Sequence, residues 1–157
     1  MSRQVINERA VELDAFGRLM RAHSVLRREL EAEVLGPRGL TINDFEALLH
    51  LSRAEERRLR RVDLADLLML SPSGVTRLLN GLEAAGLVEN VTCSSDARVI
   101  WSLLTDDGAE TLECVGASHA ARLRSLFRET LAEEEVAQLS ELLGRLPGVG
   151  PGDCAAS

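Results

Sequence analysis

Residues 64–105 read LADLLMLSPSGVTRLLNGLEAAGLVENVTCSSDARVIWSLLT and carry most of the structural information in this chain. The apolar run at the start predicts a short helix. Ser71 and Pro72 then supply a side-chain cap and a first-turn proline for a second helix. Gly86 is the expected end of that second helix, because glycine readily takes the left-handed conformation there. The stretch therefore begins with two helices separated by a tight turn.

Strand-forming residues follow the second helix. Residues 87–92 and 99–104 both predict strands, and the polar residues 93–98 between them predict a turn. Two strands alone would be marginally stable, so we expect them to pack on the helices, with Trp101 as an anchor in that packing. Two helices and a ribbon in this order predict a winged helix-turn-helix, which lays its second helix in the major groove of DNA.

Amphipathic helices are expected on both sides of this unit. Apolar residues at three- and four-residue steps run along 8–35 until Gly36-Pro37 should end the helix, and similar stripes follow the ribbon. The N-terminal stripe is longer than a small domain needs, which predicts a partner helix. We expect a mainly α fold with a small β-wing, built as one domain over 1–147: dimerisation helices at about 8–35 and 108–147, the winged helix-turn-helix at about 41–105, and a disordered tail over 148–157.

Three local features between these elements have competing interpretations. The helix over 44–53 could be capped by Thr41 or by Asn43, the latter with Glu46 in a capping box. Asp63 is the expected cap of the helix over 62–70. The segment 55–61, EERRLRR, is the only basic cluster, and is either a solvated surface or a contact to phosphates.

Composition excludes several classes of protein. The net charge of −7 argues against a general polyanion binder, although a sequence-specific DNA binder can be acidic if its acids face away from the DNA. The three cysteines form no CxxC pair, so neither a disulfide framework nor a zinc site is expected, and no cofactor is implied. Scattered histidines without metal or triad spacing argue against an enzyme. With no signal peptide or membrane span expected, we predict a cytoplasmic protein without a membrane partner.

The second helix of the pair and the ribbon tip hold the candidate DNA contacts. Arg77 has the reach for a bidentate bond to guanine or for a phosphate clamp. Arg98 could enter the minor groove, and Asp96 could fix the loop by pairing with an arginine or by accepting backbone N–H bonds. Hydrogen bonds to phosphates or base edges are expected from the remaining polar residues, Ser71, Ser73, Thr76 and Asn80.

The chain resembles the MarR family of bacterial transcriptional regulators over nearly its whole length. The landmarks are DLADLLMLSPSGVTRLLNGLEAAGLVE, Asp96-x-Arg98, and the residues 104–108, LTDDG. The resemblance implies an obligate homodimer with interlocked terminal helices that binds double-stranded DNA at a pseudo-palindromic operator, usually as a repressor. It also implies release from DNA by a small phenolic or other aromatic effector, or by cysteine oxidation in some members.

Two departures from the family pattern favour an alternative function. Gly81 and Asn90 stand where the family commonly has Arg or Lys, and this loss of positive charge should weaken phosphate binding. The alternative is therefore a protein-binding or DNA-mimicking module that keeps the fold and has weakened DNA binding.

An effector cavity is expected between the dimerisation helices and the DNA-reading domain. Plain core packing is the competing interpretation for every candidate wall residue, and His119 would then be a hydrogen-bonded buried histidine. A redox role for Cys93 or Cys114 has less support, because the family's peroxide sensors use a cysteine near the N-terminus and only Arg98 is close enough in sequence to activate Cys93. The candidate wall residues are Phe16, Met20, His23, Phe45, Leu49, His50 and His119.

Overall fold

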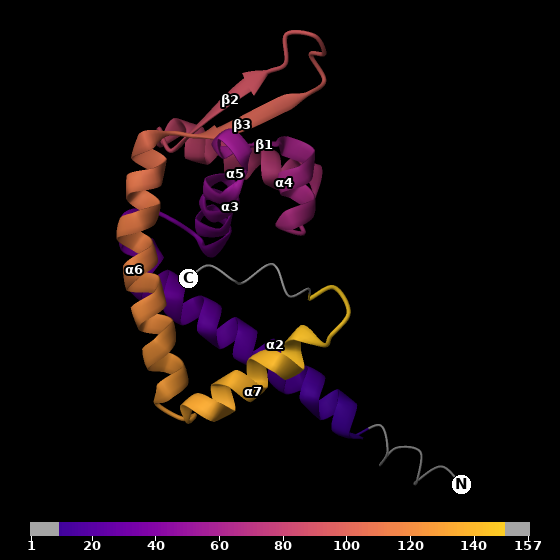
Figure 1. The fold of residues 1–157 in the computed structure, drawn as a ribbon, viewed down its shortest axis with the longest axis vertical. Helices are drawn as coiled ribbons and strands as arrows, with labels where there is room; N and C mark the ends of the chain where they lie inside the picture. The colour runs from indigo at the N-terminus through magenta and orange to yellow at the C-terminus, as the bar shows by residue number, and fades with distance from the viewer. Residues whose placement is uncertain (1–9, 150–157) are drawn as a thin grey trace, which may run out of the picture. The chain divides into compact units, whose positions relative to one another are not determined.

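The computed structural model describes residues 10–149, which divide into two compact units, one up to Ala120 and the other from Ala121. The predicted order of helix, turn, helix and β-ribbon is confirmed in the first unit (Figure 1). From residue 150 onward, the predicted disordered tail lies outside the described residues.

The N-terminal helix α2 spans Ala10–Leu30 and continues through a π-helical turn, Glu31–Leu35. The predicted stop at Gly36-Pro37 is wrong, because the backbone stays helical in a short 3-10 turn up to Arg38. Pro37 is tolerated there because it lies in the first turn, where its missing N–H is not needed. The helical path ends at Gly39, which has the left-handed φ of 71°.

Helix α3 spans Ile42–Arg53 and is capped by Thr41. The Thr41 hydroxyl accepts the backbone N–H of Asp44 at 3.2 Å, and the Asp44 carboxylate accepts the N–H of Thr41 at 2.8 Å. This reciprocal pair is a capping box. The alternative cap, Asn43 with Glu46, is therefore wrong.

The sheet contains a strand that the sequence analysis missed. Strand β1, Arg58–Arg60, pairs antiparallel with β3, Ile100–Leu104, which also pairs with β2, Val88–Thr92. The predicted two-stranded ribbon is thus a three-stranded sheet of order β1-β3-β2. The third strand removes the marginal stability expected of two strands. It went unseen because three residues are too few to show a strand's alternation, and the charge of the segment indicated a solvated surface.

The two helices of the helix-turn-helix are α4, Arg61–Leu67, and α5, Pro72–Ala84. Ser71 caps α5 as predicted, since its hydroxyl accepts the N–H of Gly74 at 3.1 Å. The predicted role of Asp63 as a cap is wrong: α4 follows β1 directly, so Asp63 lies inside its first turn and binds an arginine instead.

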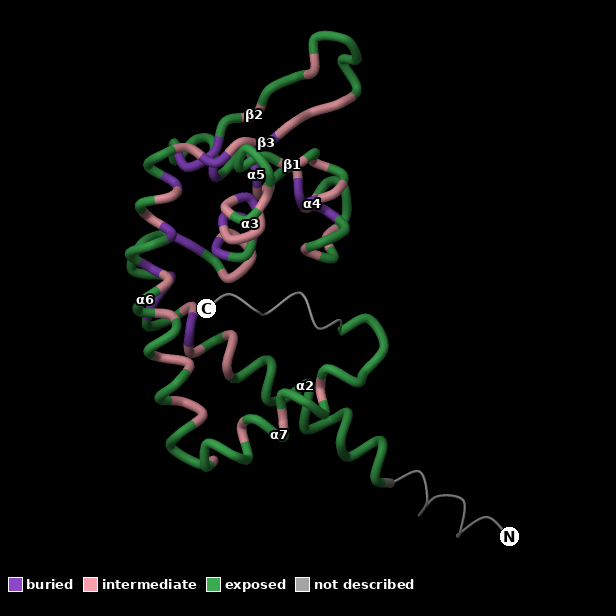
Figure 2. Tube along the Cα trace, viewed as in Figure 1, coloured by how far each residue is buried: buried purple, intermediate pink, exposed green. Residues whose placement is uncertain are grey.

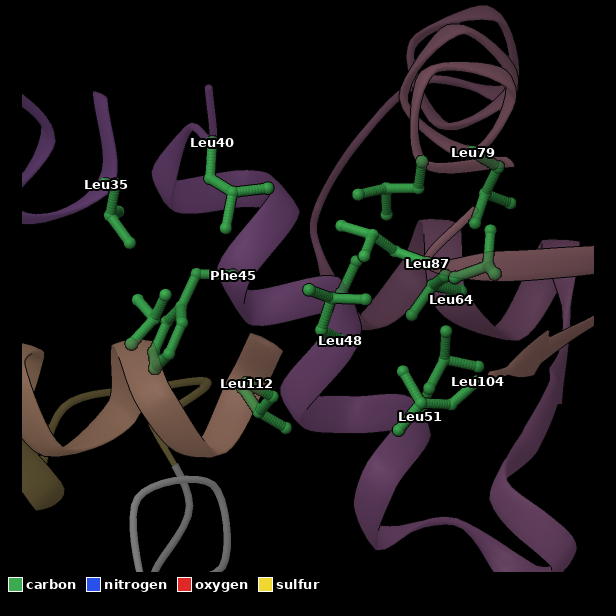
Figure 3. Close-up of a cluster of buried hydrophobic side chains, with 14 of the residues drawn as sticks. Leu35, Leu40, Phe45, Leu48, Leu51, Leu64, Leu79, Leu87, Leu104 and Leu112 are labelled. Carbon is green, nitrogen blue, oxygen red and sulfur yellow. The ribbon is translucent and has the colours of Figure 1, made fainter. Parts of the chain in front are cut away.

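The core lies where these helices meet the sheet (Figure 3). Leu48 and Leu51 of α3, Leu64 of α4 and Leu79 of α5 are completely buried there. In Figure 2 the buried stretches gather around this core, whereas α2 is exposed along most of its length.

Helix α6, Asp106–Arg128, follows β3 after a tight junction. Thr105 caps it by accepting the N–H of Gly108 at 3.0 Å, and donates its own hydroxyl to the carbonyl of Gly86 at 2.8 Å. A Cβ at Gly108 would lie 2.1 Å from the carbonyl oxygen of Leu87, so only glycine fits. This close approach explains the LTDDG landmark physically.

In the second unit, helix α7 spans Glu133–Gly144. Its first turn is fixed by Glu135, whose carboxylate accepts the N–H of Ala132 at 2.8 Å. Among the described residues, no helix is both long and apolar enough to cross a membrane.

Candidate nucleic-acid interface

Helix α5 has a buried apolar face and, opposite to it, an exposed polar face. Val75, Leu79 and Leu82 are 1%, 0% and 2% exposed, so they bury one face in the core. Ser73 and Arg77 are exposed on the other face, and Asn80 and Gly81 continue it. Arg77 makes no ion pair with any residue that the structure describes. The outer face of α5 is therefore polar, open, and carries one arginine available to a ligand.

Two of the predicted contact residues on α5 stabilise the helix itself. Ser71 is engaged as the N-cap. Thr76 donates its hydroxyl to the carbonyl of Pro72 at 2.8 Å and lies 3.5 Å from Nη1 of Arg61, which donates to it. Because the hydroxyl proton is already committed, Thr76 is left as an acceptor. The structure thus favours Ser73, Arg77 and Asn80 over Ser71 and Thr76 as direct contacts.

The wing is the loop between β2 and β3, which extends beyond the helices of the first unit (Figure 1). Asp96 accepts the backbone N–H of Arg98 at 2.9 Å, and its own carbonyl accepts the N–H of Val99 at 3.0 Å. Of the two roles considered for Asp96, backbone acceptance is the one observed. The Arg98 side chain is exposed, and no described carboxylate pairs with it.

Most of the basic cluster 55–61 is neutralised by its neighbours. Arg57 lies 3.3 Å from Asp106, and Arg58 pairs with Glu56 at 2.5 Å. Arg60 donates two bonds of 2.7 Å to Asp63, and this pairing raises the pKa of Arg60. These arginines are therefore poor candidates for phosphate binding.

Trp101 and Arg61 depart from the expectations for this region. Trp101 alternates along β3 with Ser102, which is fully buried, so the two side chains lie on opposite faces of the sheet. Trp101 stacks under the Arg58 guanidinium, 5.0 Å from the ring centroid, instead of anchoring the core.

Arg61 is half-buried against α5 and forms no ion pair within the described chain. The sequence offers nothing that separates Arg61 from the other arginines of its cluster.

The two positions that lack the family's positive charge differ in the structure. Gly81 is exposed, and a Cβ there would meet no atom within 4 Å. Asn90 is half-buried, accepts a 2.7 Å hydrogen bond from Ser102, and donates its backbone N–H to Glu83 at 2.9 Å. The side chain and the backbone N–H of Asn90, together with the charge of Arg61, lower the pKa of Glu83. A cation at position 90 would meet Glu83 first, so the deficit at a surface open to DNA is confined to Gly81.

Phe45 and His119 are the two candidate effector residues that the structure brings into contact. Their rings stack with centroids 4.4 Å apart and planes inclined by 25°. Burial lowers the pKa of His119, and its Nδ1 is buried without a hydrogen-bond partner among the described residues. His119 is therefore an aromatic packing partner and not the hydrogen-bonded histidine that was expected.

The other candidate effector residues lie on two helices. Leu49 and His50 are half-buried on α3. Phe16, Met20 and His23 are exposed on α2, Phe16 by 61% and Met20 by 43%. An effector cavity walled by this set stays a prediction.

The two described cysteines occupy different settings. Cys93 is half-buried at the wing with its sulfur 3.1 Å from the Ser95 hydroxyl. Hydrogen bonds from Ser95 and from the Asp96 backbone lower the pKa of the Cys93 thiol, so Ser95 acts where Arg98 was expected to. Cys114 is exposed on α6, and Arg38 donates to its sulfur at 3.5 Å.

Comparison with known proteins identifies relatives of this chain in sequence and in structure. The profile described as the MarR family matches residues 38–99. The HTH-type transcriptional repressor YetL of Bacillus subtilis is 30% identical over 109 residues, which cover 69% of this chain and 65% of YetL, slightly less than two thirds of its length.

Two solved structures from Streptomyces coelicolor extend the likeness to most of the chain. AbsC, a MarR family transcriptional regulator, is 35% identical with a TM-score of 0.74, over 85% of this chain and 90% of AbsC. Sco3205, a MarR family regulator solved in complex with DNA, is 26% identical with a TM-score of 0.76, over 85% of this chain and 84% of Sco3205.

Proposed function

Because the chain belongs to the MarR family of DNA-binding transcriptional regulators, we propose that it acts as a homodimeric repressor on a pseudo-palindromic operator and is released by a small aromatic effector. One observation carries the DNA-binding part of this proposal. Arg77 on the recognition helix α5 and Arg98 on the wing are both exposed, and neither is neutralised by a described carboxylate.

Each of these arginines suits a different groove. With α5 in the major groove, Arg77 reaches a guanine edge or a phosphate, and Ser73 and Asn80 on the same face reach neighbouring base edges. The wing then brings Arg98 to the adjacent minor groove, where a narrow A·T-rich stretch concentrates negative potential. Asp96 contributes indirectly, since it holds the backbone of the wing tip.

The apolar face of α2 supports the homodimer. Leu13 and Phe16 are 67% and 61% exposed, and Met20 continues the face at 43%. Contiguous exposed apolar surface of this kind marks an interaction site. A second copy of the same helix is a suitable cover, because a two-fold interface pairs identical surfaces. Two copies would set two α5–wing readers about one helical turn of DNA apart.

The effector and the direction of regulation have less support. YetL, which is named a repressor, supports repression by similarity. The Phe45–His119 stack and the aromatic and sulfur-containing side chains of Phe16 and Met20 offer apolar walls of the kind that binds an aromatic compound. Binding there would act on DNA affinity by shifting the separation of the two readers.

A protein-binding or DNA-mimicking module is the competing function. The net charge of −7 and the missing side chain at Gly81, in the middle of the contact face, are the observations that favour it. Such a module would form the same dimer without sequence-specific DNA affinity.

Fluorescence anisotropy with a labelled duplex from the region directly upstream of the gene separates these functions. We expect specific binding at low salt, and losses of about 1–3 kcal/mol in binding free energy for Arg77→Ala and for Arg98→Ala. Arg53→Ala, which removes an exposed arginine from the end of α3, is the matched control and should bind normally. A folded dimer with no preference for this duplex over unrelated DNA would favour the module.

A further inference from the structure

We propose that Arg61 and Arg98 together form a pocket that binds one phosphate of the DNA backbone between the recognition helix and the wing. This inference rests on the proposed DNA-binding function and adds a site to it. Arg61 was considered only as a member of the cluster 55–61, for which phosphate contact was one of two interpretations. Arg98, placed at the minor groove above, would here bind the phosphate at the edge of that groove.

The pocket is a cavity of about 130 Å³ between two chain segments. This volume is several times that of a water molecule in the liquid, about 30 Å³, so a phosphate oxygen and its neighbours have room to enter. One wall comes from the end of β1 and the start of α4, and the other from the end of the wing and the start of β3. The lining residues are Arg60, Arg61, Val62, Arg98, Val99 and Ile100.

The charge of this cavity is positive. Of its three arginines, only Arg60 is neutralised, by its two hydrogen bonds to Asp63. Arg61 and Arg98 pair with no carboxylate in the described chain. The charge of Glu83 interacts with Arg61 through space, but Glu83 is held by the backbone N–H of Asn90. Two of the arginines that line this cavity therefore have no ion-pair partner among the described residues.

Arg61 also has unused hydrogen-bonding capacity. Its Nη1 donates to Thr76 at a long 3.5 Å, and its Nε is buried without a partner among the described residues. A buried donor without an acceptor is unfavourable, and a shift of the Arg61 side chain that brings this donor to an oxyanion would relieve it. Guanidinium groups bind phosphate oxygens through paired N–H donors, which suits this geometry.

The position of the pocket explains why the anion should belong to DNA. Arg61 contacts Thr76 on α5, and Arg98 belongs to the wing. If α5 lies in a major groove and the wing in the adjacent minor groove, the sugar-phosphate strand that separates the grooves must pass between them. The cavity lies between the start of α4, where Arg61 contacts α5, and the base of the wing. Val62, Val99 and Ile100 form the apolar side of the cavity.

Such a contact would position the protein without reading sequence. It would also offset the cation that is missing at Gly81, since it adds positive charge beside the recognition helix instead of on it.

The test measures the salt dependence of DNA binding for the full-length protein. Arg61→Met should weaken binding to the upstream duplex and to an unrelated duplex by the same factor, about tenfold at low salt. The slope of log K against log salt should fall by about 0.9 for each contacting subunit. Arg61→Lys should keep most of the slope, because it keeps the charge, and Arg53→Met should change neither quantity.

The pair of arginines allows a second, independent measurement. Arg98→Met lies at the exposed wing and keeps the proposal testable if Arg61→Met fails to fold, which thermal unfolding reveals. If both arginines hold one phosphate, the double variant should lose less than the product of the two single losses. Independent, multiplicative losses would show that the two arginines bind separate groups and would overturn the shared pocket.

The outcomes separate this inference from the proposed function. Normal DNA binding with an unchanged salt slope in Arg61→Met overturns the pocket and leaves the DNA-binding function intact. A wild-type protein that binds DNA without sequence preference overturns the proposed function alone, and one that binds no duplex overturns both. If inorganic phosphate raises the melting temperature of the wild type but not of Arg61→Met, while the DNA slope is unchanged, the site takes a free anion and the assignment to DNA is wrong.

Discussion

Helices α2 and α5 carry similar apolar patterns but have opposite environments. The apolar residues of both recur at three- and four-residue steps. In α5 they are at most 2% exposed for Val75, Leu79 and Leu82. In α2 the corresponding values are 61% or more for Phe16 and Leu13. The periodic pattern therefore predicts that a face will be covered, but it does not say by which surface.

The difference in burial suggests different roles for the two helices. The core of the first unit covers α5, which fixes the helix and turns its polar face outward toward a ligand. No described residue of the first unit covers the α2 face to the same degree, so we infer that a second copy does. The DNA-reading surface is thus completed within one chain, whereas we propose that the spacing of two such surfaces depends on association.

The largest effect on stability is expected from a substitution on the buried apolar face of α5. Leu79→Ala removes a completely buried side chain at the centre of the core. We expect the free energy of unfolding to fall by about 2–5 kcal/mol, because a cavity remains where the side chain was. Urea denaturation followed by circular dichroism measures this, and a loss below about 1 kcal/mol would show that the core closes around the gap.

A charge on the exposed apolar face of α2 should weaken dimerisation and leave folding unchanged. In Phe16→Glu, a carboxylate would be buried in the inferred dimer interface, and the dissociation constant of the dimer should rise by at least about tenfold. The helical content of the chain should be unchanged. Sedimentation equilibrium provides the measurement, and Arg21→Glu, on an exposed α2 position, is the control. A dimer as strong as the wild type would place the interface elsewhere.

A smaller effect is expected at the polar face of α5. Gly81→Ala should stabilise the protein by about 1 kcal/mol, since Gly81 costs helix propensity and has open space around it. Gly81→Arg should in addition raise the affinity for DNA. The matched control is Gly108→Ala in α6, which should destabilise because its Cβ would lie 2.1 Å from a backbone oxygen. Thermal unfolding of the variants decides this, and equal effects at both positions would contradict it.

The smallest effect concerns pH. Burial lowers the pKa of His119 in the folded protein, so folding favours its neutral form. Stability from this residue is therefore complete above the unfolded pKa of about 6.5 and is lost as the pH falls through that value toward the folded pKa. Melting temperatures between pH 7.5 and pH 5 should fall less steeply in His119→Phe than in the wild type. In His23→Gln, on exposed α2, the wild-type profile should persist.

The sequence predicted the winged helix-turn-helix well because its landmarks are local. Ser71, Pro72 and Gly86 each act on the backbone within a few residues, and each has the predicted role. Strand β1 could not be predicted in the same way, because it is stabilised by pairing with β3, where Arg58 faces Leu103, 45 residues further along the chain. The arginines of this segment indicated a solvated surface or a phosphate contact, and neither interpretation predicts a strand.

The candidate site was less predictable than the fold. The exposure of Arg77 and Arg98 follows from helix periodicity and from the polar wing, so sequence reasoning found both. Distinguishing Arg61 from Arg60 required knowing where each carboxylate lies, because Asp63 pairs with one of them and not with the other. Asn90 was likewise interpreted from the sequence as a missing cation, and only the structure shows that it accepts a hydrogen bond from Ser102.

We propose that one α5–wing reader, although completed within one chain, is not sufficient to bind an operator, and that two copies joined through α2 bind one operator. Sedimentation velocity of the full-length protein, alone and with an excess of the upstream duplex, tests it most directly. We predict a dimer without DNA and two chains on each duplex. A monomer that binds the duplex as one chain, with full sequence preference, would contradict the account.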